Sequence, residues 1–301
     1  MTRVAAVDLG TNSTRLLVAD VEEGRLTEVV RRLRITRLGE GVDESRLLLE
    51  APMARVRAAL GEYQRELEAL GATRTLLVAT SAVRDALNGA AFLELLERDL
   101  GGVARLLGGD DEALLTFRGV TAGRELPGET LIVDVGGGST ELVVGGPGGV
   151  SLHTSLDVGC VRMTERFLAS DPPAPSELEA CAAHVRSLLP GLEIRAAIGV
   201  AGTVTTLAAL DLGLAEYDPE RIHGHVLTPR AVERELELLA SLPLARRREL
   251  PGLEPARAPV IVAGVVIVHE VLARYGLRGL EASERDILHG AALAAAELPP
   301  T

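Results

Sequence analysis

Apolar and polar positions along this chain follow two patterns: short apolar runs typical of strands, and longer stretches with helical spacing. In the segment AAVDLGTNSTRLLVAD, an apolar run ends at an Asp, turns through Gly and hydroxyl residues, and resumes as an apolar run. This pattern predicts two buried strands joined by a polar turn. The pattern then predicts a helix at 52–71, a strand at 73–80, a helix at 81–101, a strand at 103–107 and a helix at 110–120. The first part of the chain should therefore form a mixed sheet with helices packed on it.

A similar hairpin, in the segment LIVDVGGGSTELVVGG, begins the second part of the chain. It is followed by predicted strands at 150–159, 194–200 and 279–284 and predicted helices at 161–169, 176–189, 201–211, 229–242, 259–276 and 285–298. The helix at 259–276 is so apolar that we expect it to be buried. With 301 residues, of which 47% are hydrophobic, the chain exceeds the usual size of one domain. We place the boundary near residue 125, which predicts phosphate-binding domains at 1–125 and 126–301.

The two hairpins match each other at an offset of 126 residues. The matched residues are Val7, Asp8, Gly10, Ser13, Thr14, Leu17 and Val18 in the first copy and Val133, Asp134, Gly136, Ser139, Thr140, Val143 and Val144 in the second. Such a turn directs backbone donors at an anion, because glycine lets the main chain approach closely and successive N–H groups form a nest. Two copies predict a clamp for phosphate. The match breaks where Arg15 corresponds to Glu141, and we expect chemistry at this asymmetry.

Charge and composition argue against several classes of function. The formal net charge of −12 disfavours binding of nucleic acid across the whole surface, and an aromatic content of 2% disfavours base stacking. The chain has no run of about 18 apolar residues, and its start lacks a secretory signal. These features predict a cytoplasmic protein without a membrane partner. Cys160 and Cys181 have no ligand-like spacing, so neither a disulfide nor a zinc site is expected.

Seven segments, taken in order, resemble the exopolyphosphatase and guanosine pentaphosphate phosphohydrolase (Ppx/GppA) family: DLGTNSTR, ATSAVRDA, GGDDEALLTFRGV, DVGGGSTEL, SLDVGCVRMTERF, GVAGTVTTLAAL and RIHGHVL. The resemblance implies an α/β fold of the duplicated ribonuclease H-like (actin/hexokinase) type, with two domains of mixed sheets flanked by helices and a cleft between them. It also implies Mg²⁺-assisted hydrolysis of the terminal phosphoanhydride of inorganic polyphosphate, with pppGpp as a further substrate, and self-association as a homodimer. In this family the last helix can return to the first domain, so we expect residues 285–301 to pack there.

Phosphoryl transfer requires a phosphate held in line with a nucleophile and neutralisation of the charge on its oxygens. We expect each turn to hold one phosphate through its hydroxyl and N–H groups. Arg84 matches an arginine of the family and presents a planar fork to phosphate oxygens. Gly202 and Thr203 lie in the turn that opens the segment 201–211, and they add N–H groups at the N-terminus of the helix that follows. The predicted phosphate-binding residues are Thr11, Asn12, Ser13, Arg84, Gly137, Gly138, Ser139, Thr140, Gly202 and Thr203.

Glu112 and Glu141 match the two essential glutamates of the family and are the predicted catalytic residues. We expect Glu112 to act as the general base for the attacking water and Glu141 to position water or Mg²⁺. Asp134 is the predicted inner metal ligand, because Mg²⁺ prefers a few carboxylate oxygens together with water and substrate phosphate. Asp8, its counterpart in the first copy, either binds the metal in the same way or caps the turn.

Structural interpretations of the same residues remain open. An acid in a first helical turn stabilises the helix dipole, which would explain Glu112, and Thr203 is a suitable N-cap. Arg84 would form an ordinary ion pair, and His223 and His225 would be hydrogen-bonded structural residues.

Two other functions are also open. One is a nucleotide-dependent kinase of the same superfamily, and the other is a non-catalytic sensor of polyphosphate or pppGpp. Pro259 and Leu288 stand where the family usually has an acid and an arginine. Both departures bear on substrate choice, whereas neither affects the catalytic glutamates.

Overall fold

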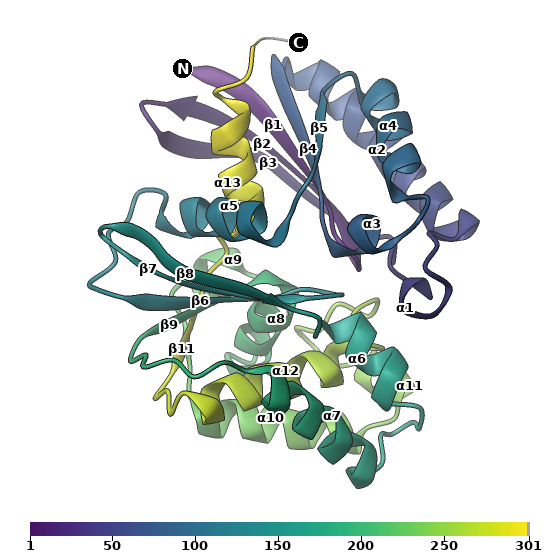
Figure 1. Ribbon diagram of the computed structural model, residues 1–301, viewed down its shortest axis with the longest axis vertical. Coiled ribbons are helices and arrows are strands. Elements are labelled where there is room, and N and C mark those ends of the chain that lie inside the picture. Colours follow the sequence, from purple (N-terminus) through teal and green to yellow (C-terminus); the bar gives the residue numbers. More distant parts are fainter. Residues whose placement is uncertain (300–301) are drawn as a thin grey trace. The chain divides into compact units, whose positions relative to one another are not determined.

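The computed structural model describes residues 1–299 as two compact units. One unit is Met1–Glu125 together with the C-terminal segment from Arg285, and the other is Leu126–Glu284. Each unit is built on a mixed sheet flanked by helices (Figure 1), which confirms the predicted α/β class. The assignment of the two units as phosphate-binding domains stays a prediction. Within residues 1–299, no helix is both long enough and apolar enough to cross a membrane.

The first unit has a five-stranded sheet in the order β3-β2-β1-β4-β5. Its strands are β1 (Thr2–Leu9), β2 (Ser13–Glu22), β3 (Arg25–Ile35), β4 (Arg74–Ala79) and β5 (Val103–Leu106). Its helices are α1 (Val42–Ser45), α2 (Glu50–Leu70), α3 (Ser81–Asp85), α4 (Gly89–Leu100), α5 (Gly109–Thr121) and α13 (Ile287–Ala295). β1 pairs antiparallel with β2 and parallel with β4.

Apolar side chains cover both faces of this sheet. Ala5 and Val7 of β1 belong to a core formed with α2 and α4, whereas Val4 and Ala6 belong to a second core formed with α13. Successive strand residues point to opposite faces, so a strand buried on both sides has a continuous apolar sequence. This explains why β1, β2 and β4 could be predicted from the sequence.

The sequence pattern missed β3 and merged two helices into one. β3 is an edge strand with an Arg-rich and largely exposed sequence, so it lacks an apolar run. The predicted helix at 81–101 is divided into α3 and α4. Gly89 packs on the α3 backbone, where a Cβ atom would lie 1.9 Å from the carbonyl oxygen of Val83.

Helices α5 and α13 touch through glycines. A Cβ atom at Gly119 would lie 1.9 Å from the carbonyl oxygen of Asp286, and one at Gly290 would lie 1.9 Å from that of Leu115. The backbones of the two helices therefore meet without intervening side chains. This contact ties the end of the chain to the helix that carries Glu112.

We expect Gly290→Ala to lower the free energy of unfolding by about 1–3 kcal/mol, the usual cost of overpacking. The added methyl group would force α5 and α13 apart, because the atom that it meets is backbone. Gly61→Ala in α2 is the matched control, since a Cβ atom there meets nothing within 4 Å and alanine favours a helix. Chemical denaturation followed by circular dichroism measures both. Equal unfolding free energies for the two variants would contradict the close contact.

The second unit has a six-stranded sheet in the order β10-β11-β9-β6-β7-β8. Its strands are β6 (Thr130–Val135), β7 (Thr140–Gly146), β8 (Gly149–Leu156), β9 (Ala197–Val200), β10 (Val226–Leu227) and β11 (Leu280–Ala282). Its helices are α6 (Cys160–Phe167), α7 (Pro175–Leu188), α8 (Ala201–Asp211), α9 (Pro219–Ile222), α10 (Pro229–Ser241), α11 (Leu244–Arg247) and α12 (Ile261–Arg274). β6 pairs antiparallel with β7 and parallel with β9, which repeats the arrangement of β1, β2 and β4.

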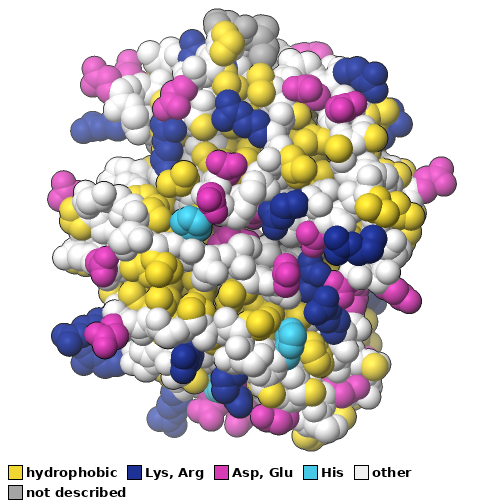
Figure 2. All heavy atoms as spheres, in the orientation of Figure 1, with side chains coloured by type: hydrophobic (Ala, Val, Ile, Leu, Met, Phe, Trp, Pro, Cys, Tyr) yellow, Lys and Arg dark blue, Asp and Glu magenta, His cyan; other side chains and the backbone are white. Residues whose placement is uncertain are grey.

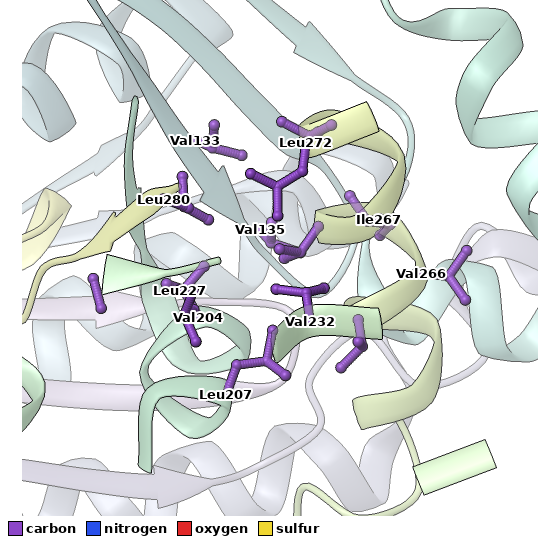
Figure 3. Packing of buried hydrophobic residues seen from close by; sticks show 14 of the residues in the cluster. Val133, Val135, Val204, Leu207, Leu227, Val232, Val266, Ile267, Leu272 and Leu280 are labelled. Atoms are coloured by element: carbon purple, nitrogen blue, oxygen red, sulfur yellow. The ribbon is translucent and has the colours of Figure 1, made fainter. Parts of the chain in front are cut away.

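One large apolar core packs against this second sheet. Figure 3 shows Val133 and Val135 of β6 together with Ile267 and Leu272 of α12. α12 is buried along most of its length, which confirms the burial expected from its sequence. On the face of the molecule shown in Figure 2, acidic and basic side chains are interspersed, so this face has no broad basic surface.

Candidate active site

The two predicted phosphate loops have the same backbone geometry. In the first unit, the N–H of Gly10 donates to the carbonyl oxygen of Ser13 at 3.0 Å. In the second, the N–H of Gly136 donates to the carbonyl oxygen of Ser139, also at 3.0 Å. Each loop joins two antiparallel strands, β1 to β2 and β6 to β7. The sequence repeat is therefore also a structural repeat.

Strand register places the exchange of Arg15 for Glu141 opposite an aspartate in both units. Asp8 of β1 pairs with Arg15 of β2, and Asp134 of β6 pairs with Glu141 of β7. Directly opposed residues of antiparallel strands project from the same face. The first unit thus pairs an acidic side chain with a basic one across the two strands, whereas the second unit pairs two acidic side chains. Two neighbouring carboxylates repel unless they share a cation or a proton.

Asp8 is already paired with the positive charge of Arg15. Arg15 donates from Nε at 2.8 Å and from Nη2 at 2.6 Å, both to Oδ2 of Asp8. The other oxygen, Oδ1, is buried and has no hydrogen-bond partner among the described residues. Burial raises the pKa of Asp8, and Arg15 opposes this shift. Because a guanidinium already compensates its charge, Asp8 is a weaker metal candidate than the acids of the second unit.

Asp134 and Glu141 are both buried, with 8% and 4% of their surface exposed. Oε1 of Glu141 accepts a hydrogen bond from Oγ of Ser155 at 2.9 Å, which fixes the glutamate on its strand. Within residues 1–299, no group of three or more His, Cys, Asp or Glu forms a metal cage. Mg²⁺ usually takes one or two carboxylates and completes its shell with water and phosphate. This acidic pair therefore fits an open Mg²⁺ site of oxygen donors.

The structure brings Glu112 and Arg84 together. Glu112 lies in the first turn of α5, 4% exposed, and Arg84 extends from α3. Nη1 of Arg84 donates to Oε1 of Glu112 and, at 2.9 Å, to the carbonyl oxygen of Leu107. The guanidinium orients the carboxylate and compensates its charge. The two predicted residues therefore form one unit of a candidate site, and the dipole of α5 does not account for Glu112 by itself.

The first loop is tied to its surroundings on two sides. Oγ1 of Thr11 shares a hydrogen bond of 2.9 Å with Oγ of Ser81, the first residue of α3. The carbonyl oxygen of Asn12 accepts from the N–H groups of Thr36 and Arg37 at 3.1 and 2.9 Å. Oδ1 of Asn12 is buried without a hydrogen-bond partner among the described residues. The loop is thus held in place while keeping an uncommitted polar side-chain atom.

The second loop is held by α6. The carbonyl oxygens of Gly136 and Gly137 accept from the N–H groups of Cys160 and Val161 at 2.9 and 2.8 Å. In addition, Nε of the buried Arg162 donates to the carbonyl oxygen of Gly138 at 2.8 Å. Because α6 engages these carbonyl oxygens, the conformation of the loop is set before any ligand binds.

The side chain of Thr140 is engaged in a hydrogen bond within the protein. Its Oγ1 donates to the carbonyl oxygen of Val158 at 2.5 Å, so this hydroxyl ties β7 to the segment before α6. A hydroxyl has a single proton, and here the protein itself accepts it. The hydroxyl of Thr140 therefore has no proton to donate to a phosphate while this hydrogen bond is kept.

We expect Gly159→Ala to displace the second loop. A Cβ atom there would lie 2.3 Å from the carbonyl oxygen of Gly137 and 2.5 Å from the backbone nitrogen of Gly138. The clash involves backbone, so the loop must move, at a cost of about 1–3 kcal/mol of unfolding free energy. KM for a phosphate-containing substrate should rise. Denaturation and steady-state assays test this; an unchanged KM with unchanged stability would contradict the close approach.

Arg257 is a candidate site residue that sequence reasoning missed. A Cβ atom at Gly202 would lie 1.4 Å from its Nη1, so the guanidinium rests on the glycine at the start of α8. Thr203 lies inside α8, whose N-cap is Val200, so the capping interpretation of Thr203 is wrong. The sequence signal was the single cation in PARAPVIVAG, but nothing in the pattern indicated which loop it would reach.

His223 and His225 have structural hydrogen bonds. Nε2 of His225 lies 2.7 Å from Oδ2 of Asp211, and Nδ1 of His223 accepts from the N–H of Glu284 at 3.2 Å. These contacts support the structural interpretation of both histidines. Leu288, one of the departures from the family pattern, is fully buried in the α13 core.

We compared the chain with models of known protein families and with known proteins. The model of the Ppx/GppA phosphatase family matches residues 17–296. The chain belongs to the Ppx/GppA phosphatase family. The resemblance inferred from seven motifs, the actin/hexokinase-type fold class and the expectation of a phosphatase are thereby confirmed. As a family member, the chain is a hydrolase.

Similar proteins share nearly the whole length of this Ppx/GppA member. Exopolyphosphatase 2 of Mycobacterium tuberculosis is 39% identical over 317 residues, which cover 98% of this chain and 99% of that protein. The crystal structure of an exopolyphosphatase-like protein is 36% identical with a TM-score of 0.92 and covers 97% of both chains. The Aquifex aeolicus PPX-GPPA enzyme is 33% identical with a TM-score of 0.83, covering 97% of this chain and 99% of that one.

Proposed function

We propose that this phosphatase is a cytoplasmic exopolyphosphatase that hydrolyses the terminal phosphoanhydride of inorganic polyphosphate with the help of Mg²⁺. The observation that carries the proposal is the duplicated loop and the side chains paired beside it. These are an aspartate and an arginine in the first unit, and an aspartate and a glutamate in the second. The names of the similar proteins support the choice of substrate.

The loops supply the phosphate contacts. Oγ of Ser13 and Oγ of Ser139 occupy matched positions, and neither makes a hydrogen bond to another described residue. Such hydroxyls, together with the N–H groups of Gly137 and Gly138, are suited to donate to phosphate oxygens.

Glu112 is proposed to accept the proton of the attacking water. The water oxygen forms a bond to the terminal phosphorus, the bridging P–O bond breaks, and the shortened polyphosphate leaves with the electron pair. Arg84 holds the carboxylate of Glu112 in one orientation. Mg²⁺ held by Asp134 and Glu141 would neutralise negative charge on the reacting phosphoryl group. Both residues are buried and supply carboxylate oxygens, which suit that ion.

The alternatives are less consistent with these residues. A sensor needs no general base, yet Glu112 is buried, oriented and paired with an arginine. A kinase of this superfamily would use an aspartate base for a sugar hydroxyl, whereas the proposed base is a glutamate. Hydrolysis of pppGpp and formation of a homodimer stay predictions.

Release of orthophosphate tests the proposed function. The purified protein is incubated without ATP, with tripolyphosphate, long-chain polyphosphate or pppGpp, in Mg²⁺ or in excess chelator. We expect Mg²⁺-dependent release from at least one polyphosphate. Absence of release from both polyphosphates in Mg²⁺ would contradict the proposal, and release from pppGpp alone would reassign the substrate.

A further inference from the structure

Asp286 lies at the junction of several elements of the first unit. It is 2% exposed and caps α13, where Oδ1 accepts the N–H of Leu288 at 3.0 Å. Its carbonyl oxygen packs against Gly119 of α5, the helix that carries Glu112. No motif in the sequence pointed to this residue. A buried carboxylate is stable only when it is paired or hydrogen-bonded. The partners of Asp286 therefore show which side chains it orients.

The charged partner of Asp286 is Arg15, which it shares with Asp8. Nη1 of Arg15 donates to Oδ2 of Asp286, while Nε and Nη2 donate to Oδ2 of Asp8. Burial alone would raise the pKa of Asp286, but Arg15 and His289 outweigh burial and hold it below its usual value. One guanidinium is thus fixed between two carboxylates, one on the first phosphate loop's strand and the other on α13. Its plane cannot rotate without breaking one of these contacts.

Asp286 is itself held from behind by His289. The two residues form a reciprocal capping box, in which Nδ1 of His289 accepts the N–H of Asp286 at 3.3 Å. The other ring nitrogen, Nε2, lies 2.9 Å from Oε1 of Glu28. His289 is 1% exposed, so its ring is also fixed by packing. Each group in the series from Glu28 to Asp8 therefore has a defined orientation.

We propose that Asp286 is a positioning residue for phosphate hydrolysis: through Arg15 it fixes the carboxylate of Asp8 and the first phosphate loop. The inference rests on the proposed function, because it assigns the free oxygen of Asp8 to that reaction. Oδ1 of Asp8 is buried without a hydrogen-bond partner among the described residues. Its direction is therefore determined by the hydrogen bonds that Arg15 donates to the other oxygen, Oδ2. Asp286 also lies against α5 and so relates the loop to the helix of Glu112. Groups that orient site residues in this way commonly affect activity 10- to 100-fold.

Asp286→Asn separates positioning from capping. Asparagine caps a helix as well as aspartate does, so α13 should keep its N-terminus, whereas the negative charge that faces Arg15 is lost. We expect kcat for orthophosphate release from polyphosphate to fall about tenfold or more, with KM nearly unchanged. Arg15→Gln should reduce kcat at least as much. The double variant should be no worse than Arg15→Gln, because Asp286 acts through that arginine.

Glu270→Gln is the matched control. Glu270 is a buried carboxylate of α12 that pairs with Arg186, and neither residue belongs to the proposed site. Its kcat should equal that of the wild type, and denaturation should show comparable stability for this variant and Asp286→Asn. A folded Asp286→Asn with wild-type kcat would overturn the inference, as would losses that multiply in the double variant. A wild-type protein that releases no orthophosphate would instead contradict the proposed function.

Discussion

Glu112→Gln is expected to reduce kcat for orthophosphate release by about 10²–10⁴-fold, the range that a general base contributes. Glutamine keeps the shape of the side chain in its buried position in the first turn of α5 but cannot take a proton from water. The contact with Arg84 can be retained through the amide oxygen. KM should change much less than kcat, because the phosphate loops remain intact.

Glu50→Gln is the matched control for this prediction. Glu50 is also an acid in a first helical turn, that of α2, but its side chain is exposed. If Glu112 served only the helix dipole, the two variants would lose similar small amounts of stability and neither would lose activity. Steady-state assays with polyphosphate at saturating Mg²⁺, combined with thermal unfolding, distinguish these cases. An active Glu112→Gln variant would remove this residue from the proposed mechanism.

Glu141→Gln should have the second largest effect, a loss of roughly a hundredfold or more in kcat/KM together with a higher requirement for Mg²⁺. A metal ion contributes several kcal/mol of transition-state stabilisation, and each 1.4 kcal/mol is about tenfold in rate. The substitution leaves Asp134 as the one acid of its cross-strand pair. With one carboxylate fewer, the ion should bind more weakly.

Ser155→Ala distinguishes a ligand role from a structural one. The substitution removes the hydrogen bond that Oε1 of Glu141 accepts but retains the carboxylate. We expect its Mg²⁺ requirement to stay close to that of the wild type. Phosphate release measured over a range of Mg²⁺ concentrations provides the comparison. If Glu141→Gln required no more Mg²⁺ than Ser155→Ala, the proposed metal site would have to be abandoned.

Much of the fold follows directly from the sequence pattern. β1 and β6 were predicted because burial on both faces leaves a continuous apolar run, and α12 because a buried helix is apolar on all sides. β3 escaped prediction for the opposite reason, since an edge strand needs no such run. The break between α3 and α4 escaped because it depends on a contact between Gly89 and Val83, which no local pattern encodes.

The sequence likewise predicted one part of the candidate site and missed another. The repeat at 126 residues identified both loops and the exchange of Arg15 for Glu141, since matched sequence produces matched hairpins. The repeat did not show which side chains Arg15 contacts. Besides Asp8, Arg15 pairs with Asp286, which is 271 residues away in the sequence. The guanidinium that rests on Gly202 comes from Arg257.

Sequence by itself determined the buried central strands, the two loops and the chemical types of the candidate residues, because these depend on local periodicity and on short motifs. The tertiary structure alone decided which charges meet. Arg84 reaches Glu112, and Arg15 joins Asp8 to Asp286, only because separate helices and strands pack together. A buried charge is stable beside a partner of opposite sign, and that partner can come from any part of the chain that packing brings within reach.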